Sequence, residues 1–302
     1  MSDLKQPNDR PPVCDYEGST YQTSFWEQGG RAYEDGTEAV ALKRLLPDGG
    51  RLMLEVGAGA GRNSPRYKNF DTVVLMDYSV TQLQQAQQRL GRSGKYLYVA
   101  ADVYRLPFVA GLFDAATMIR VLHHMAEPQL ALRQVRETLQ PGAVFILEFA
   151  NKLNLKAILR YWLKQQDWSP FSHEPVEYIP LNYDFHPKAI RRWLKEEQFQ
   201  VGRQLTVSHF RIGLLKKIVP TGVLVWMDSL AQLTGNWWQL TPSVFVHTQA
   251  VGDTPAAEAG SFFRCPECQQ PLAPPVEDRF TCSCGLHWAI QDGIYNFKEP
   301  VS

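Results

Sequence analysis

A glycine-rich segment, LEVGAGAGR at residues 54–62, begins with an apolar run that is typical of a buried strand. Gly57, Gly59 and Gly61 leave the backbone bare, so a ligand can approach the N–H groups of the loop closely. A strand that ends in such a turn and leads into a helix points those N–H groups and the positive helix end into a crevice. The loop therefore predicts a site for a nucleotide or a carboxylate.

The spacing of the three glycines separates two classes of nucleotide cofactor. A dinucleotide fingerprint needs its third glycine at position 62, where the pyrophosphate lies against the start of the helix. In this chain position 62 is Arg62 and the third glycine is Gly61, which makes the pattern G-x-G-x-G. Arg62 therefore argues against an oxidoreductase with a dinucleotide cofactor.

Four of the five cysteines lie near the C-terminus, as Cys265 and Cys268 in RCPECQQPL and as Cys282 and Cys284 in FTCSCGLHW. Two such pairs can surround one zinc ion tetrahedrally, and metal binding can fold a module that has almost no core of its own. The second pair is tighter than the common C-x-x-C, so His287 is an alternative fourth ligand. Because four thiolates leave no open position at the metal, the pattern predicts a structural zinc ribbon.

The glycine pattern, with Glu55 two places before Gly57, resembles motif I of the class I S-adenosylmethionine-dependent methyltransferases. The resemblance covers about residues 20–250, because further segments follow in the order that is usual in that family. These segments are the acids at strand ends, LPF, FDAATMIRVLHHM and ETLQPGAVFILEF. It implies an α/β fold with a Rossmann-like sheet of seven mostly parallel strands flanked by helices. It also implies that S-adenosylmethionine is the methyl donor.

The same resemblance assigns roles to single residues. Asp77 would bind the two ribose hydroxyls, since a carboxylate accepts two hydrogen bonds at once, and Asp102 would meet the adenine amino group. An acid at a strand end is also a common turn former or helix cap, and Glu55 is either part of the methionine-end network or a buried network member. The predicted cofactor residues are Glu55, Gly57, Ala58, Gly59, Gly61, Asp77, Tyr78, Asp102, Val103 and Arg120.

Methyl transfer from a sulfonium is an in-line displacement, so the protein mainly has to align the acceptor, the methyl group and the sulfur and to exclude water. A neutral acceptor can still need a general base. His123 and His124 follow the fourth predicted strand, and Glu148 ends the fifth, so these three are the catalytic candidates. The alternative for the histidines is that they only cap or line the loop.

The elements that must position these residues alternate between apolar runs and polar helical stretches from residue 51 onward, which is typical of a parallel sheet covered by helices. The predicted strands are 52–56, 72–77, 96–102, 113–119, 143–149, 203–210 and 243–250. Ser79 followed by Gln82 makes a capping box that starts a helix ending at Gly91, and a second helix follows Pro128.

The chain is predicted to consist of two folded units. Residues 1–45 form an N-terminal helical lid or an ordinary core helix, and their aromatic residues are Tyr16, Tyr21, Phe25, Trp26 and Tyr33. Residues 46–250 form the methyltransferase domain, of which about 151–235 include a substrate-lid insertion. Residues 251–262 have the composition of a linker, and residues 263–302 form the zinc ribbon.

The predicted substrate lid carries two interleaved patterns. Apolar residues recur at helical spacing, and cations recur on a step of four; these are Leu155, Ile158, Leu159, Trp162 and Leu163, with Lys152, Lys156, Arg160 and Lys164. Three interpretations of such a helix are open. It lies on anionic lipid, it receives an anionic substrate, or it packs on the core with one side and exposes a basic side to solvent. The apolar segment 212–230 extends the same surface, but Lys216, Lys217, Pro220 and Asp228 break it, so it does not predict a membrane span.

Composition limits the partners and the compartment. Lysine plus arginine and aspartate plus glutamate are 31 each, so no global positive field attracts nucleic acid. The ribbon is rich in acids, which argues against RNA binding and favours a stabilising or protein-docking role. The polar, proline-rich N-terminus and the clustered cysteines, with Cys14 apart, predict a cytoplasmic protein.

The ribbon also resembles the C-terminal half of small zinc-binding proteins related to the activator subunit of certain tRNA and release-factor methyltransferases, in CGLHWAIQDGIYNF. The leading hypothesis is therefore a methyltransferase that acts on oxygen, nitrogen or carbon of a small-molecule or lipid-like acceptor. The alternatives are an RNA- or protein-directed methyltransferase that uses the ribbon for recognition, and a cofactor-binding adaptor that has lost transfer.

Overall fold

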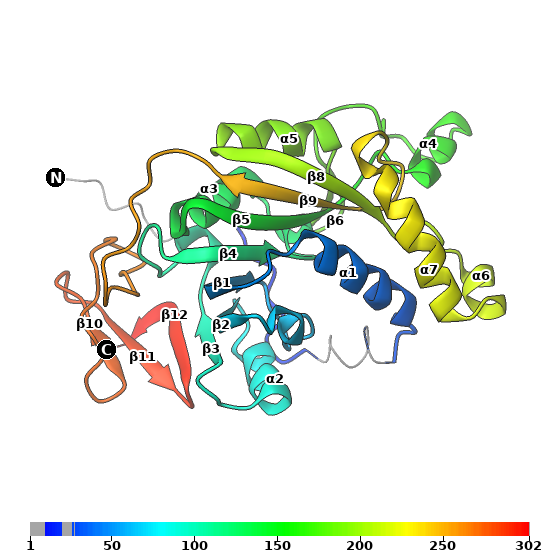
Figure 1. Cartoon of the computed structure of the whole chain (residues 1–302). Coiled ribbons are helices and arrows are strands. Elements are labelled where there is room, and N and C mark those ends of the chain that lie inside the picture. The colour runs from blue at the N-terminus through cyan, green and yellow to red at the C-terminus, as the bar shows by residue number, and fades with distance from the viewer. Residues whose placement is uncertain (1–9, 20–25, 27, 302) are drawn as a thin grey trace.

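The computed structural model describes residues 10–19, 26 and 28–301, and Figure 1 shows a twisted sheet crossing the molecule with helices packed around it. The strands lie side by side in the order β10-β11-β12-β3-β2-β1-β4-β5-β9-β8. Their bounds are β1 (Gly50–Val56), β2 (Phe70–Asp77), β3 (Tyr96–Ala100), β4 (Phe113–Met118), β5 (Leu139–Ala150), β8 (Phe199–Val207), β9 (Ser243–Ala250), β10 (Arg279–Thr281), β11 (His287–Gln291) and β12 (Ile294–Val301). A separate hairpin joins β6 (Val176–Ile179) to β7 (Asn182–Asp184).

The sheet has ten strands, so the predicted number of seven was wrong. The seven predicted segments form β1 to β5, β8 and β9, and the three further strands come from the C-terminal cysteine module. β12 pairs in parallel with β3, with Ile294 opposite Tyr98. The physical reason is that β3 would otherwise be an edge strand with unpaired N–H and C=O groups, which a further strand can satisfy.

The central strands are parallel, and this brings their carboxyl ends to one edge of the sheet. β1 pairs in parallel with β2 on one side and with β4 on the other, with Glu55 opposite both Leu75 and Thr117. The strand order therefore runs from β1 to β2 and β3 on one side and from β1 to β4 and β5 on the other. The order reverses between β1 and β4, and ligands of open α/β sheets bind at such a topological switch point. β9 runs antiparallel to β5 and to β8.

The helix at Val80–Leu90 begins and ends at residues that cap it. Ser79 accepts a hydrogen bond from the N–H of Gln82 at 3.2 Å, and Gly91 ends that helix at a φ of 80°, which confirms the predicted cap and stop. The helices are α1 (Ala32–Leu45), α2 (Val80–Leu90), α3 (Pro128–Thr138), α4 (Leu155–Trp162), α5 (Pro187–Glu196), α6 (Gly213–Ile218) and α7 (Thr221–Ala231). The 3-10 turns are η3 (Ser64–Tyr67), η4 (Val103–Arg105), η5 (Leu122–His124) and η6 (Gln232–Asn236).

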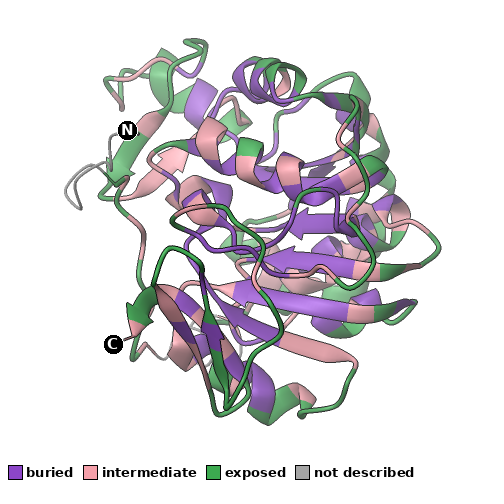
Figure 2. Ribbon diagram, turned by 90° about the vertical axis from the view of Figure 1, so that its left-hand side faces the viewer, coloured by how far each residue is buried: buried purple, intermediate pink, exposed green. Residues whose placement is uncertain are grey.

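The C-terminal module shares its core with the main sheet. Figure 2 shows buried residues running along the central strands, and the largest buried cluster continues from them to Trp288 and Phe297. Phe263 packs against Phe108 with 5.9 Å between ring centroids. Within 251–262, predicted as a linker, the N–H of Ala257 donates to the carbonyl of Gly111 at 2.9 Å. Segment 251–262 therefore packs against the loop that connects β3 to β4.

Candidate active site

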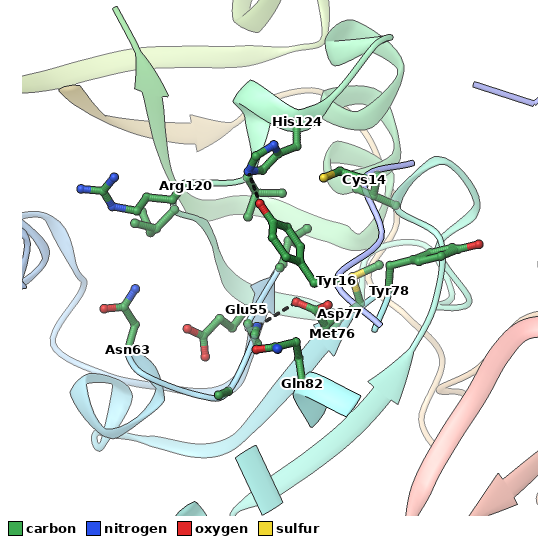
Figure 3. Close-up of a pocket in the computed structure, with 18 of the residues that line it drawn as sticks. Cys14, Tyr16, Glu55, Asn63, Met76, Asp77, Tyr78, Gln82, Arg120 and His124 are labelled. Atoms are coloured by element: carbon green, nitrogen blue, oxygen red, sulfur yellow. Dashed lines mark hydrogen bonds between the residues drawn. The ribbon is translucent and has the colours of Figure 1, made fainter. Parts of the chain in front are cut away.

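A cleft opens at the carboxyl ends of β1, β2 and β4, and Figure 3 shows the side chains that line it. It contains about 960 Å³ of empty space, part of it open to solvent. The predicted cofactor residues that line it are Glu55, Gly57, Ala58, Gly59, Asp77, Tyr78, Val103 and Arg120. Gly61 and Asp102 lie outside the lining.

The glycines of the loop serve different purposes. A Cβ on Gly57 would lie 2.1 Å from Cγ2 of Val121, so this position has no room for a side chain. Gly59 lies in the left-handed region at a φ of 52°, and its N–H donates to Oδ2 of Asp77 at 2.8 Å. Gly61 permits close packing instead, because a Cβ there would lie 2.7 Å from Cδ1 of Leu90 at the end of α2.

Asp77 ends β2 with its carboxylate held by the backbone. Oδ1 accepts from the N–H of Ser79 at 2.9 Å, and Oδ2 accepts from Gly59. Each oxygen keeps lone pairs for a ligand, because a carboxylate offers about four acceptor sites. Burial raises the pKa of Asp77 above its ordinary value, although the hydrogen bonds from Ser79 and Gly59 oppose this shift.

Asp102 has partners of its own in this structure. Its Oδ1 accepts from the N–H of Tyr104 at 2.9 Å and so caps η4, and its Oδ2 lies 3.4 Å from Nε of Arg105. These are the contacts of a turn-forming acid, which was the alternative that the sequence left open. The role of Asp102 at the adenine amino group stays a prediction, while the neighbouring Val103 lines the cleft.

Glu55 is buried beneath the glycine loop and accepts a hydrogen bond from Oγ of Ser64 at 2.5 Å. Burial raises the pKa of Glu55 to about 7, although the Ser64 hydrogen bond opposes the shift. A carboxyl group with this pKa exchanges a proton near neutral pH, so it can adapt its charge to the polar end of a bound ligand.

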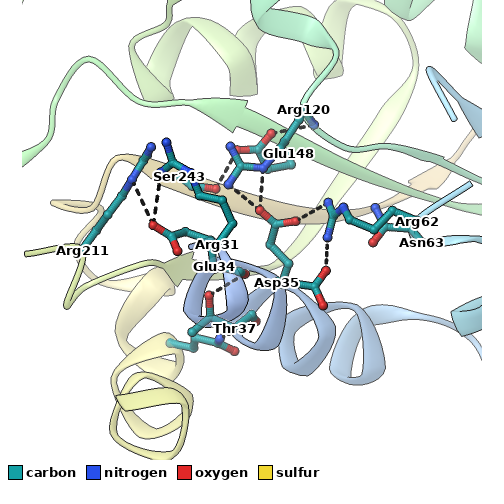
Figure 4. Close-up of polar contacts among 12 residues, drawn as sticks. Arg31, Glu34, Asp35, Thr37, Arg62, Asn63, Arg120, Glu148, Arg211 and Ser243 are labelled. Carbon is teal, nitrogen blue, oxygen red and sulfur yellow. Dashed lines mark hydrogen bonds and ion pairs between the residues drawn. The ribbon is translucent and has the colours of Figure 1, made fainter. Parts of the chain in front are cut away.

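A buried ion-pair network closes the side of the cleft nearest α1, and Figure 4 shows Asp35, Arg62 and Arg120 among its members. Glu38 accepts from Nη2 of Arg62 at 2.7 Å and from Nε of Arg120 at 2.6 Å. The guanidinium of Arg62 lies 3.6 Å above the ring centroid of Trp26, as a cation–π pair. Arg62 also pairs with Asp35. Arg62 thus holds α1 to the glycine loop.

Sequence reasoning missed Glu38, which lies in a helix that was predicted only as part of an N-terminal lid. Its side chain is about 1% exposed. Burial alone would raise the pKa of Glu38, but Arg120 and Arg62 lower it below its ordinary value. The only sequence signal is a run of acids at the start of α1, and such a run is usually solvated.

We expect the Glu38→Ala variant to lose about 3–5 kcal/mol of unfolding free energy, because it leaves Arg62 and Arg120 without their shared carboxylate. Urea denaturation measures this loss. Glu196→Ala is the matched control, since Glu196 pairs with Arg192 at 3.8 Å where both side chains are about half exposed. That control should lose less than about 1 kcal/mol. Equal losses in the two variants would contradict a structural role for the buried network.

The three catalytic candidates lie in different places, and only His124 lines the cleft. Its Nδ1 lies 3.0 Å from the carbonyl of Leu181, and its Nε2 lies 3.1 Å from the hydroxyl of Tyr16. A carbonyl can only accept, so the assigned tautomer carries its proton on Nδ1 and leaves Nε2 as an acceptor. Burial lowers the pKa of His124, so the imidazole is neutral at pH 7.

His123 and Glu148 lie behind the cleft. Nδ1 of His123 is buried without a hydrogen-bond partner among the described residues, and burial lowers the pKa of this histidine well below its ordinary value. Glu148 accepts from the N–H of Arg120 at 2.9 Å and from Oγ of Ser243 at 2.6 Å. Glu148 therefore positions the backbone of Arg120. A catalytic role for His123 or Glu148 stays a prediction.

The N-terminal segment crosses the mouth of the cleft. Val13, Cys14, Tyr16 and Trp26 are among the lining residues, and Figure 3 shows Tyr16 pointing toward His124. Glu17 anchors the segment by accepting from two N–H groups at the start of α2, each at 2.9 Å. Two of the predicted lid aromatics, Tyr21 and Phe25, lie outside the described residues. α1 itself packs against β8 and α7 as a core helix.

A second groove lies between α4, β8 and the chain that enters β9, and sequence reasoning missed one residue there. Asp184, at the end of β7, lines this groove beside Arg211, Thr241 and Trp238. Burial, together with the nearby Glu148, raises the pKa of Asp184 to about 6. A half-buried carboxyl group with a raised pKa is typical of functional sites.

The four C-terminal cysteines form a cluster in which all sulfur atoms lie within 4.8 Å of one another. Sγ of Cys265 lies 3.9 Å from that of Cys284, and Cys268 lies 3.3 Å from Cys282. Zinc–sulfur bonds of about 2.3 Å in a tetrahedron separate the sulfurs by about 3.8 Å, so the set fits zinc. His287, the alternative ligand, lies outside this cluster, and its Nδ1 is 3.1 Å from Oγ1 of Thr281.

None of the helices in the described part of the chain is long and apolar enough to cross a membrane.

Sequence comparison relates the sheet domain to known methyltransferases. Residues 54–147 match a family described as a methyltransferase domain. A ubiquinone/menaquinone biosynthesis C-methyltransferase of Pseudomonas savastanoi pv. phaseolicola is 32% identical over 123 residues, which are 37% of this chain and 48% of that protein. An uncharacterised chloroplastic methyltransferase of Arabidopsis thaliana is 29% identical over 140 residues, 43% of this chain and 39% of the relative. The chain thus spans about half or less of these curated relatives.

Solved structures share the fold. An S-adenosylmethionine-dependent methyltransferase of Listeria monocytogenes has a TM-score of 0.53 at 14% identity, covering 73% of this chain and 99% of that one. A Haloferax volcanii complex of a methyltransferase activator with a methyltransferase gives a TM-score of 0.55 at 13% identity, covering 77% of this chain and 96% of that one. The family match includes the glycine loop and strands β2 to β4, which carry most of the cleft. Residues 54–147 therefore match a methyltransferase domain, and the chain has the Rossmann-like α/β fold of these solved structures.

Proposed function

We propose that this chain transfers a methyl group to a small-molecule or lipid-like acceptor at the cleft between β1, β2 and β4. The observation that carries the proposal is the placement of Asp77, whose two oxygens are oriented by Gly59 and Ser79 at the floor of the cleft. When bound, S-adenosylmethionine supplies an electrophilic methyl group on a sulfonium. The residues of this chain bind the donor, orient the acceptor and exclude water.

The polar groups around the cleft have separate tasks in this proposal. Asp77 accepts from the ribose hydroxyls, and the bare backbone at Gly57 admits the ligand against the loop. Glu55, with its pKa near 7, lies at the methionine end. His124 is positioned to take a proton from a neutral acceptor, because it lines the cleft and the Tyr16 hydroxyl is the one partner of its Nε2 among the described residues.

The acceptor is proposed to be small and largely apolar. Relatives of the sheet domain include methyltransferases named for ubiquinone and menaquinone biosynthesis and an O-methyltransferase of Penicillium expansum. The second groove adds apolar lining from Leu155, Leu159 and Leu163 together with one carboxyl group, Asp184. Glu148 acts electrostatically on Asp184 and also binds the backbone of Arg120, which lines the cleft. The two hollows are therefore neighbours.

The cysteine cluster is proposed to hold one structural zinc ion through Cys265, Cys268, Cys282 and Cys284. Bound zinc supplies a cross-link between the two loops that carry the pairs. The module then covers the edge of β3, next to the cleft residue Val103. A protein-docking role for this module, as in an activator complex, is the second candidate, because the Haloferax volcanii neighbour contains such a complex.

Calorimetric titration tests the donor. We expect the zinc-replete protein to bind S-adenosylmethionine and S-adenosylhomocysteine and to give no binding heat with NADH, because Arg62 occupies the position that a pyrophosphate needs. Binding of neither sulfur nucleoside, or a preference for NADH, would overturn the proposed function.

A further inference from the structure

Helix α7 exposes the side of itself that an amphipathic helix normally buries. Val223, Trp226, Met227 and Leu230 stand at spacings of three and four residues, which is the apolar stripe of a surface helix. All four are exposed, and Trp226 is 63% exposed. The inward face carries Leu224 and Asp228 instead. The stripe is therefore directed away from the core.

The neighbouring elements repeat this arrangement. On α4, Leu155, Leu159, Trp162 and Leu163 are exposed, while Ala157 and Ile158 face the core. Leu214 and Ile218 of α6 are exposed as well, and Trp237 directly after η6 is 80% exposed. We call these side chains, with those of α7, the apolar face.

The parts of the apolar face lie at one end of the molecule. Figure 1 shows α4, α6 and α7 together at the end of the sheet opposite the cysteine module. The second groove joins them, because α4, the segment before α6 and the segment after η6 all line it. Soluble monomers rarely expose large contiguous apolar patches, so a face of this kind indicates an interaction surface.

The charges around the apolar face are cationic. Lys156, Arg160 and Lys164 follow the apolar positions of α4, and Lys217 lies between Leu214 and Ile218 on α6; all four are exposed. None of the four is in an ion pair with a described residue. Lys152, which was predicted to belong to this row, is buried and donates to Oγ of Ser172 at 2.9 Å, so that part of the prediction was wrong.

Negative charge is scarce on the same elements. Within 155–166 and 211–240, all of which the structure describes, the sequence has a single acid, Asp228. Its carboxylate is buried and accepts from the hydroxyl of Tyr33 at 2.6 Å. Asp167, Glu174 and Glu177 follow only in the chain after α4. The cations therefore face outward without a compensating acid on these helices.

We propose that the apolar face docks the protein peripherally on an anionic lipid bilayer. Helices that lie in the membrane interface bury their apolar side to the headgroup and acyl boundary and bind anionic headgroups with flanking lysines and arginines. Tryptophan is enriched at that boundary, which suits Trp162, Trp226 and Trp237. α7 has 11 residues, too few to span a bilayer, so it lies along the surface. Docking does not require methyl transfer, although Leu155, Leu159 and Leu163 of the apolar face also line the second groove.

Vesicle flotation of the full chain tests the proposal. We compare vesicles of phosphatidylcholine alone with vesicles that also contain phosphatidylglycerol, and we expect binding to the anionic vesicles that falls as salt rises. The variant Lys156→Glu/Lys164→Glu/Lys217→Glu should lower the partition coefficient about 100-fold, since each cation contributes about fivefold. The variant Trp226→Ser/Trp237→Ser should lower it at least about tenfold and should reduce the blue shift of tryptophan fluorescence on binding.

Matched controls lie away from the apolar face. Arg51→Glu/Lys68→Glu/Arg279→Glu changes the same number of exposed cations elsewhere, and Val276→Ser removes another exposed apolar side chain. Both controls should bind like the unchanged protein. Equal loss in the controls, or no binding to anionic vesicles, overturns the proposal.

A second copy of the chain is the competing occupant of the apolar face. Self-association in sedimentation velocity that Trp226→Ser/Trp237→Ser abolishes, without vesicle binding by the unchanged protein, would identify a protomer interface and overturn membrane docking. Titration with S-adenosylhomocysteine on every variant separates this failure from a failure of the proposed function, because none of the substituted residues lines the cleft.

Discussion

The Asp77→Ala variant is expected to raise the Kd for S-adenosylhomocysteine at least about 100-fold, because two hydrogen bonds to a charged carboxylate contribute about 1.5–3 kcal/mol each. The effect is large because the two oxygens are already oriented by Ser79 and Gly59, so the ligand meets a preformed acceptor pair. Isothermal calorimetry measures the change.

The controls for Asp77 separate binding from folding. Asp71→Ala changes an exposed acid on the same strand, β2, at the end away from the cleft, and should leave Kd unchanged. Asp77→Asn keeps the shape and one acceptor oxygen, so an intermediate Kd is expected. Melting followed by circular dichroism shows whether each variant is folded. If folded Asp77→Ala protein binds as tightly as the unchanged protein, the ribose does not lie at this carboxylate.

Replacement of Cys265 or Cys282 by serine is expected to abolish the bound zinc and to lower Tm by about 10–20 °C. Zinc folds small finger peptides with about 10–16 kcal/mol, and a loss of about 5 kcal/mol shifts a domain of this size by that amount. Part of the stability is retained, because the aromatic cluster around Phe263 packs without the metal. Elemental analysis and thermal melting check the two outcomes.

Two further variants make the metal prediction specific. Cys14→Ser removes the one cysteine outside the cluster and should leave the zinc content at one per chain. His287→Ala removes the alternative ligand and should also retain zinc, because four sulfurs complete the tetrahedron. If Cys282→Ser keeps its zinc and His287→Ala loses it, His287 is the fourth ligand in place of Cys282. If both cysteine variants keep their full zinc content, the cysteine cluster is not the zinc site.

Destabilisation by zinc loss should extend to the cofactor cleft. β12 pairs in parallel with β3, and the residue that follows β3 by three positions, Val103, lines the cleft. When the module loosens, β3 becomes an edge strand whose outer N–H and C=O groups lose their partners. The structure thus connects the C-terminal module to the cleft through β3, which its separate sequence motif does not indicate.

Features that depend on short stretches of chain were predictable from the sequence. The glycine loop, the Ser79 cap with its stop at Gly91 and the central strands each follow from a window of a few residues, because φ/ψ preference, capping and apolar periodicity are local. The position of Asp77 at the end of β2 was predictable for the same reason, since this residue directly ends an apolar strand. The cysteine spacing likewise indicated which four side chains would come together.

Only the tertiary structure determined which distant groups meet. Glu38 contacts Arg62 and Arg120 across sequence separations of 24 and 82 residues, and no local pattern marks that acid as different from a solvated one. The ten-stranded sheet depends on β12 finding the free edge of β3, and the outward apolar stripe of α7 has the same periodicity as an inward one. Helical and strand periodicity fix which residues share a face; which way that face is turned depends on the energy of long-range packing.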